Sequence, residues 1–203
     1  MKSTILLSRD GVICNHKFTS YNEVDIGMFS KKQKLVILDE ELYTRRIISC
    51  SEEEINHNIK KLFGENNDFV YDYFSFNKKR ETIVYAIRGL SNIMKICEKA
   101  YSVEVEPIQL IVVNNLKSKY HKFDLIFTYK DNNYYISYNG KYITSSIVEP
   151  ETNIFMKRVQ ELIDNNIVVV DRRALSRISI DIINAYKEVI DEKRIFKQRF
   201  FTR

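Results

Sequence analysis

Short apolar runs alternate with polar residues near the start of the chain and predict a β-hairpin. Residues 4–7 and 12–18 are two such runs, and the dipeptide Asp10-Gly11 stands between them. Because Asp-Gly favours a tight turn with positive φ, we expect the chain to turn at this dipeptide. Residues 34–49 form a third β-type segment. The chain therefore begins with a β-rich unit.

A helix start follows this unit. Ser51 and Glu54 form a capping box, in which each side chain can bond the backbone N–H of the other residue, so we expect a helix from residue 52. Its apolar positions recur at helical spacing and form one stripe: Ile55, Ile59, Leu62 and Phe63. Such a stripe more often packs on a sheet than binds a partner.

Strand and helix patterns continue to alternate after this helix. Residues 69–76 and 82–87 indicate strands, and Ser91 indicates the start of a helix. Pro107 then interrupts the pattern, and residues 108–113 indicate a buried strand. This alternation is typical of an α/β fold in which helices cover a mixed sheet.

The second half of the chain repeats this organisation. Three strand-like runs meet around Asn139-Gly140, a helix starts near Glu151, and residues 167–170 indicate a short strand. A last helix is expected to carry one apolar side made of Leu175, Ile178, Ile182, Tyr186 and Val189. We therefore predict two domains, residues 1–120 and residues 121–203.

Composition narrows the function classes. The chain has 32 basic and 27 acidic residues, but five of the basic residues lie in the last eleven positions: Lys193, Arg194, Lys197, Arg199 and Arg203. The rest of the chain is neutral and lacks the distributed basic stripe of a nucleic-acid-binding protein. The three cysteines and three histidines have no spacing typical of a zinc site or a catalytic nucleophile. We therefore expect no metal, and the short apolar run at the N-terminus is too short for a signal peptide.

Two stretches resemble a known family. "KLVILDEELYTRRIISCSEEEINHNIKKLF" and "ETIVYAIRGLSNIMKICEKAYSVEVEPIQLIVV" are similar to the actin-like cytoplasmic domains of type IV pilus and type II secretion inner-membrane assembly proteins, the pilus M and secretion L components. The Lys, Asn, Ile and Tyr content resembles that of the bundle-forming pilus C component. The resemblance implies an actin-like, ribonuclease-H-like fold of two subdomains, with mixed sheets covered by helices.

The resemblance also implies a degenerate nucleotide site. Counting back from Asn139-Gly140, the place of the family's phosphate-facing Asp-x-Gly is held by Ile126, Phe127 and Thr128, and Glu149-Pro150 stands where its Gly-Gly would follow. A phosphate cradle needs glycines so that backbone N–H groups can approach the anion. We therefore expect no cofactor and no catalytic residue, and an actin-like ATP-binding protein or ATPase is the alternative.

The family's function implies partners and a location. It implies a scaffold on the cytoplasmic face of the bacterial inner membrane that docks the hexameric assembly ATPase and contacts other platform proteins. Tyr134, Tyr138 and Tyr142, in the edge formed by residues 133–146, are the candidate docking residues, although such tyrosines more often simply cover a sheet. The basic residues from Lys193 to Arg203 are expected to lie near the membrane, before a transmembrane helix that follows this chain.

Overall fold

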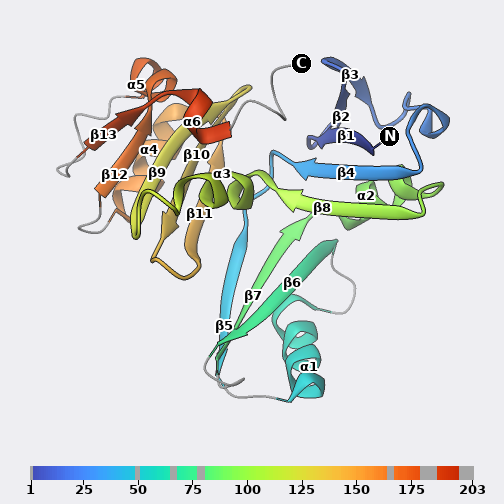
Figure 1. Cartoon of the computed structure of the whole chain (residues 1–203), viewed down its shortest axis with the longest axis horizontal. Coiled ribbons are helices and arrows are strands. Elements are labelled where there is room, and N and C mark those ends of the chain that lie inside the picture. Colours follow the sequence, from blue (N-terminus) through green and yellow to red (C-terminus); the bar gives the residue numbers. More distant parts are fainter. Residues whose placement is uncertain are drawn as a thin grey trace.

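Three β-sheets with packed helices organise the residues that the structure describes. The computed structural model describes residues 2–48, 51–64, 68–76, 81–163, 167–178 and 187–196. Within these ranges, a pair of sheets has five strands each and a smaller sheet has three. Figure 1 shows the smaller sheet reaching away from the larger pair. No helix in these ranges is both long and apolar enough to cross a membrane.

The first sheet has the strand order β3-β2-β1-β4-β8. β1 pairs parallel with β4, and β4 pairs parallel with β8, whereas β2 and β3 complete an antiparallel edge. Its elements are β1 (Lys2–Leu7), β2 (Gly11–Cys14), β3 (Lys17–Ser20), the 3₁₀ helix η1 (Ile26–Met28), β4 (Lys32–Ile37), α2 (Leu90–Cys97) and β8 (Ser102–Pro107). The carboxyl ends of β1 and β4 therefore lie side by side.

The second sheet has the strand order β11-β10-β9-β12-β13. β9, β10 and β11 form an antiparallel meander, and β12 pairs parallel with both β9 and β13. Its elements are β9 (Phe123–Tyr129), β10 (Asn132–Tyr138), β11 (Ile143–Glu149), α4 (Thr152–Gln160), β12 (Ile167–Asp171), α5 (Arg172–Arg177), β13 (Lys187–Ile190) and α6 (Glu192–Phe196). α3 (Ile108–Leu116) connects it to the first sheet.

The third sheet is antiparallel, with the order β5-β7-β6, and carries α1 at its far end (Figure 1). Its elements are β5 (Tyr43–Ile48), α1 (Glu52–Phe63), β6 (Phe69–Phe76) and β7 (Glu81–Arg88). The capping box between Ser51 and Glu54 is present, which confirms the expected helix start. Ile55 and Ile59 pack against the sheet with Val84 in a separate small core.

One large apolar core joins the two five-stranded sheets. Ile5 and Leu35 of the first sheet belong to the same buried cluster as Phe127 and Tyr134 of the second. The strands of the first sheet all precede α3 and those of the second all follow it. The domain boundary at residue 120 stays a prediction, and the shared core means that the two halves are not packed independently of each other.

The expected buried strand at residues 108–113 is wrong, because this segment belongs to helix α3. Pro107 precedes the helix with an extended backbone, and the helix buries apolar side chains on nearly every side, such as Ile108, Val112 and Leu116. A short continuous apolar run fits a buried strand and a buried helix equally well.

Two expectations for the first half are also corrected. Residues 34–49 are not one segment: β4 and β5 lie in different sheets. The positive φ values of the first hairpins occur at Asn15 and His16, between β2 and β3, and not at Gly11. Gly11 is required for another reason, since a Cβ there would lie 2.3 Å from the backbone oxygen of Thr19.

The expected last helix is wrong where its residues are described. α5 ends at Arg177, and Val189 lies in β13, which pairs parallel with β12. Ile182 and Tyr186, which belong to the same expected helix, lie outside the described residues. Leu175 and Val189 are both exposed, and the buried residues beside them belong to different clusters, Ile178 to that of Tyr135 and Ile190 to that of Tyr134.

Candidate functional site

A cleft lies between the two large sheets, where the first turns of the two halves face each other. The β1–β2 turn supplies Ser8, Arg9 and Asp10, and the β9–β10 turn supplies Lys130 and Asp131. The cleft has a volume of about 500 Å³, and its remaining walls are formed by Ile13, Phe18, Leu38, Asp39, Asn132, Val148 and Pro150. It opens at the carboxyl ends of the parallel strands β1 and β4, where α/β proteins commonly bind ligands.

Local hydrogen bonds shape the two turns. The backbone N–H of Ser8 donates to the carbonyl of Gly11 over 2.9 Å, which closes the β1–β2 turn. Lys130 adopts a left-handed conformation with φ of 54°, and its carbonyl accepts a hydrogen bond from Arg177 of α5. The β1–β2 turn is therefore closed by its own backbone, and the β9–β10 turn is anchored to α5.

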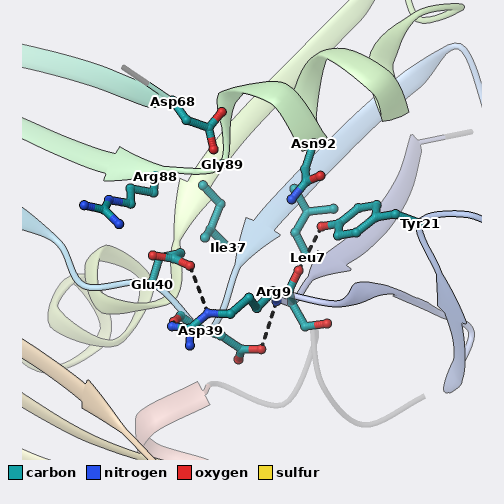
Figure 2. Close-up of a pocket in the computed structure, with 11 residues that line it drawn as sticks. Leu7, Arg9, Tyr21, Ile37, Asp39, Glu40, Asp68, Arg88, Gly89 and Asn92 are labelled. Atoms are coloured by element: carbon teal, nitrogen blue, oxygen red, sulfur yellow. Dashed lines mark hydrogen bonds and ion pairs between the residues drawn. The ribbon is translucent and has the colours of Figure 1, made fainter. Parts of the chain in front are cut away.

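Arg9 extends along the cleft wall and is held by the residues after β4 (Figure 2). Its Nε lies 3.4 Å from Oε1 of Glu40, and its Nη2 donates to the carbonyl of Asp39 over 3.2 Å. Its backbone N–H donates to Oδ2 of Asp39, also over 3.2 Å. The guanidinium is thus engaged by the chain itself.

Asp39 joins the two halves of the molecule across the cleft. One carboxylate oxygen accepts from the backbone of Arg9, and the other accepts from Nδ2 of Asn132 over 2.9 Å. Burial raises the pKa of Asp39; Arg9 opposes this shift, and the nearby carboxylates of Glu40 and Asp10 add to it. Both oxygens therefore already have partners in the protein.

The next two residues continue this link, so we call residues 39–41 the acidic connector. The carbonyl of Glu40 accepts from Nε2 of Gln109 in α3 over 2.7 Å. Glu41 forms an ion pair of 2.6 Å with Arg158 of α4 and accepts from the backbone of Val148. The acidic connector is therefore bonded to both α3 and α4.

A smaller pocket of about 170 Å³ adjoins the cleft and shares Arg9 and Asp39 with it. Figure 2 shows Tyr21 on one side and Arg88 on the other, with Gly89 and Asn92 between them. The hydroxyl of Tyr21 donates to the carbonyl of Ser8 over 2.8 Å. Burial, with Asp39 and other nearby carboxylates, raises the pKa of Tyr21 to about 12, so this phenol is neutral at physiological pH.

Opposite Tyr21, Asp68 fixes the start of α2. Its carboxylate accepts from the backbone N–H of Ser91 over 2.5 Å and from the Ser91 hydroxyl over 2.6 Å. Burial acts to raise the pKa of Asp68, but the hydrogen bonds from Ser91 outweigh it and lower the pKa. This carboxylate caps a helix.

The larger cleft has few features of a phosphate cradle. None of the described residues that line it is a glycine, and of its two basic side chains Arg9 is held by Glu40. Among the described residues, no three His, Cys, Asp or Glu side chains are grouped to hold a metal ion. The cleft walls offer apolar surface and the carboxylates of Asp10 and Asp131.

The place counted for the Asp-x-Gly motif is not at the cleft. Ile126, Phe127 and Thr128 are buried inside β9, and the turn that reaches the cleft is Lys130-Asp131, two residues further on. The expected position was counted back from Asn139-Gly140. That turn joins β10 to β11 and lies at the end of β10 away from the cleft. Pro150, by contrast, does line the cleft.

The tyrosines expected to dock a partner lie mainly inside the protein. Tyr134 is fully buried, with its ring stacked on Phe127 at 4.6 Å between centroids, and Tyr138 is buried against Phe123. Tyr142 is half-buried, with its ring 6.4 Å from that of Phe76. The expectation that Tyr134 and Tyr138 dock a partner at the surface is therefore wrong, because both side chains are buried in the core.

The expected membrane-proximal segment begins inside the fold. Ile195 and Phe196 of α6 are buried, and Phe196 contacts Tyr129 with 5.1 Å between ring centroids. Arg194 is exposed on the same helix. The side chain of Lys193, and the whole of Lys197, Arg199 and Arg203, lie outside the described residues.

Sequence reasoning missed Arg9, Asp39 and Asn132 as the residues that shape the cleft. Three consecutive acids between two strands were a visible signal, but no local pattern identifies partners such as Asn132, which is 93 positions from Asp39. The sequence also gave no sign that Asp171, at the end of β12, would be a fully buried carboxylate.

Comparison with known proteins shows the fold. The sequence matches no protein-family model and no curated protein. The structure is similar to a Bacteroides thetaiotaomicron protein of unknown function with an actin-like ATPase fold, with 14% identity, a TM-score of 0.52, and 95% of this chain and 93% of that chain covered.

Two further solved structures come from assembly machines. The chain is similar to the cytoplasmic domain of EpsL, an inner-membrane component of the type II secretion system of Vibrio cholerae, with 11% identity, a TM-score of 0.51, and 83% and 81% coverage. It is also similar to a chain of the PilM–PilN type IV pilus biogenesis complex, with 9% identity, a TM-score of 0.51, and 83% and 74% coverage. Together these matches confirm the predicted actin-like α/β fold.

Proposed function

We propose that this chain is a cytoplasmic scaffold domain of a type IV pilus or type II secretion inner-membrane platform, where it docks the hexameric assembly ATPase. The observation that carries the proposal is the fold shared with the EpsL cytoplasmic domain and with PilM–PilN. The cleft supports it, because Asp39 accepts hydrogen bonds from both Arg9 and Asn132 where an actin-like ATPase would bind phosphate. A bundle-forming pilus is the system that the composition favours.

The proposed docking surface is the seam between β5 and β11. Thr144, an exposed residue of the 133–146 edge, lies on this side, and a hollow of about 270 Å³ opens there between β5, β11 and α4. The side chains of Thr44, Thr144, Ser145, Ser146 and Arg45 line it. The hydroxyls of Thr44 and Thr144 donate to backbone carbonyls, and that of Ser146 accepts from the backbone N–H of Leu42. Such a polar rim, with the half-buried Tyr142 beside it, suits a protein partner.

Co-purification with the ATPase of the same gene cluster tests the proposal. We expect the wild-type domain to retain the ATPase, and a Thr144→Arg, Ser145→Arg variant to bind it about tenfold more weakly, or about 1.4 kcal/mol. Tyr71→Arg on the exposed strand β6 is the matched control and should bind normally. Failure of the wild-type domain to bind the ATPase would contradict the assignment, whereas normal binding by the double variant would contradict only the surface.

The proposed location includes the membrane. We infer that Lys197, Arg199 and Arg203 lie against the anionic leaflet just before a transmembrane helix, because basic flanks mark the cytoplasmic side and contribute about 1 kcal/mol each. Arg194, exposed on α6, adds to this charge. Vesicles containing acidic lipid should retain the chain in a flotation assay, and neutral vesicles should not. Equal retention by both, or by neither, would contradict the membrane contact.

An actin-like ATP-binding protein is the second candidate, because a cleft of about 500 Å³ stands at the carboxyl ends of β1 and β4. We expect Mg-ATP to bind no better than about millimolar, since the cleft lacks glycine-lined backbone and Arg9 is occupied. Calorimetric titration decides between the two, and a micromolar dissociation constant would favour the second candidate.

A further inference from the structure

The cleft between the β1–β2 and β9–β10 turns has an apolar wall that is open to solvent. Phe18 of β3 is 52% exposed although its side chain faces the cleft. Ile13, Leu38, Val148 and Pro150 extend the same wall. With a volume of about 500 Å³ the cleft falls within the range of ligand-binding pockets. An exposed aromatic ring in a concave surface gains free energy when a ligand covers it.

The charges that face the cleft leave it acidic. Asp10 and Asp131 stand on opposite turns, both exposed, and among the described residues neither carboxylate has a hydrogen bond or an ion pair. Arg9 does not neutralise them, because Glu40 and Asp39 hold its guanidinium. The ammonium group of Lys130 lies over the ring of Tyr129, 5.9 Å from its centroid. Two carboxylates therefore remain for a ligand.

We propose that the cleft binds a short basic peptide segment of a platform partner, with its Lys or Arg between Asp10 and Asp131 and an adjacent apolar side chain on Phe18. This inference rests on the proposed scaffold function. A basic segment fits better than an anion, because a nucleotide phosphate would face the same two carboxylates without a glycine-lined cradle. A peptide fits better than a small amine, because surface ion pairs alone give weak binding and the apolar wall must also be covered.

The cleft is also prepared for such a segment. Asp39 accepts from Arg9 in the β1–β2 turn and from Asn132 next to the β9–β10 turn, which holds the two turns at a fixed distance, so binding would require little reorganisation. Tyr21, which donates to the carbonyl of Ser8, holds the β1–β2 turn from behind. The segment would therefore enter a preformed site.

Fluorescence anisotropy with a labelled hexapeptide, GLRFKG, tests this proposal on the full chain. We expect saturable binding that weakens with salt, and at least tenfold weaker binding of the matched acidic peptide GLEFEG. Asp10→Asn combined with Asp131→Asn, and separately Phe18→Ala, should each weaken GLRFKG binding about fivefold. Equal affinity for the two peptides, or unchanged affinity in both variants, would overturn the proposal.

Matched controls keep the test specific. Glu53→Gln on α1 removes an exposed acid far from the cleft, and Tyr71→Ala removes an exposed ring on β6, so neither should change the affinity. Displacement of the peptide by Mg-ATP at micromolar concentration would overturn the proposal by showing a phosphate site. If the domain retains the ATPase but binds no peptide, only this inference fails; if it binds the peptide but not the ATPase, only the proposed function fails.

Discussion

The two five-stranded sheets share a large hydrophobic core, whereas α1 and the three-stranded sheet pack around a small one. The large sheets share one buried cluster that reaches from Ile5 in β1 to Phe196 in α6. The α1 face of the small sheet has its own cluster, formed by Ile47, Ile55, Ile59, Phe63, Val84 and Ala86. Because stability follows the apolar area buried, the body should unfold as one unit and the α1 region should open more easily.

The largest effect is expected in the shared core. Phe127→Ala removes a fully buried ring that stacks on Tyr134 and contacts Phe196, so the free energy of unfolding should fall by about 3–5 kcal/mol. Urea denaturation monitored by far-UV circular dichroism measures this. Phe18→Ala, which removes an exposed ring, should change it by less than about 0.5 kcal/mol. Similar losses in the two variants would mean that the core is not where stability is concentrated.

Ile59→Ala sharpens the comparison between regions. Ile59 is buried in the α1 core, and its truncation should cost about 2–4 kcal/mol there. Amide hydrogen exchange should speed up in α1 while exchange in β1 and β4 changes little. Leu62→Ala, on the partly exposed side of α1, serves as the control. If exchange speeds up equally in α1, β1 and β4, the α1 region does not open independently of the two large sheets.

Asp39→Ala breaks the link across the cleft. It removes the acceptor for both Arg9 and Asn132, and we expect a loss of about 1–3 kcal/mol in the free energy of unfolding. A double-mutant cycle with Asn132→Ala should give a coupling of about 1 kcal/mol. Asp131→Ala, which lacks a partner among the described residues, should stay within about 0.5 kcal/mol of wild type. If the losses of Asp39→Ala and Asn132→Ala simply add in the double variant, the hydrogen bond between the two side chains does not contribute to stability.

The smallest effect is a change with pH. Burial raises the pKa of Asp171 in the folded state, so the native protein binds a proton here more tightly than the unfolded chain. Stability should therefore fall as pH rises from the ordinary Asp pKa through the raised value. Asp171→Asn should reduce this fall, as measured by urea midpoints from pH 4 to pH 7, and leave the part that comes from the raised pKa of Asp39, whereas Asp131→Asn should keep the whole fall. An identical slope in Asp171→Asn would rule out Asp171 as its source.

The elements with local signals could be predicted from the sequence. The capping box at Ser51 and Glu54 fixes the start of α1, since its contacts lie within four residues. The segment that became α3 could not be assigned, because its apolar residues are buried on nearly all sides and show no period that separates helix from strand.

The candidate site was less predictable for a related reason. Tyr134 and Tyr135 point to opposite faces of β10, and both are fully buried, because the large core covers one face and α4 covers the other. In a sheet with one face in water, the residues of a strand are alternately buried and exposed. Alternating tyrosines fit an exposed face and a covered face equally well, so the sequence alone does not tell which face is covered. The cleft depends on contacts between residues far apart in the chain, which no local rule reports.

Helix α3 packs against both halves of the chain, and this affects which fragments can be expressed and how the chain folds. Its side chains are shared: Gln109 bonds the acidic connector, Asn115 donates to the carbonyl of Ile195 in α6, and its apolar faces meet both halves. A fragment ending near residue 120 would expose these faces to water, so we expect it to aggregate when expressed alone. Because Ile195 of α6 lies 80 positions after Asn115, the helix can complete its packing only after that whole stretch has been synthesised. Folding should therefore be slow and cooperative, limited by contacts between distant segments.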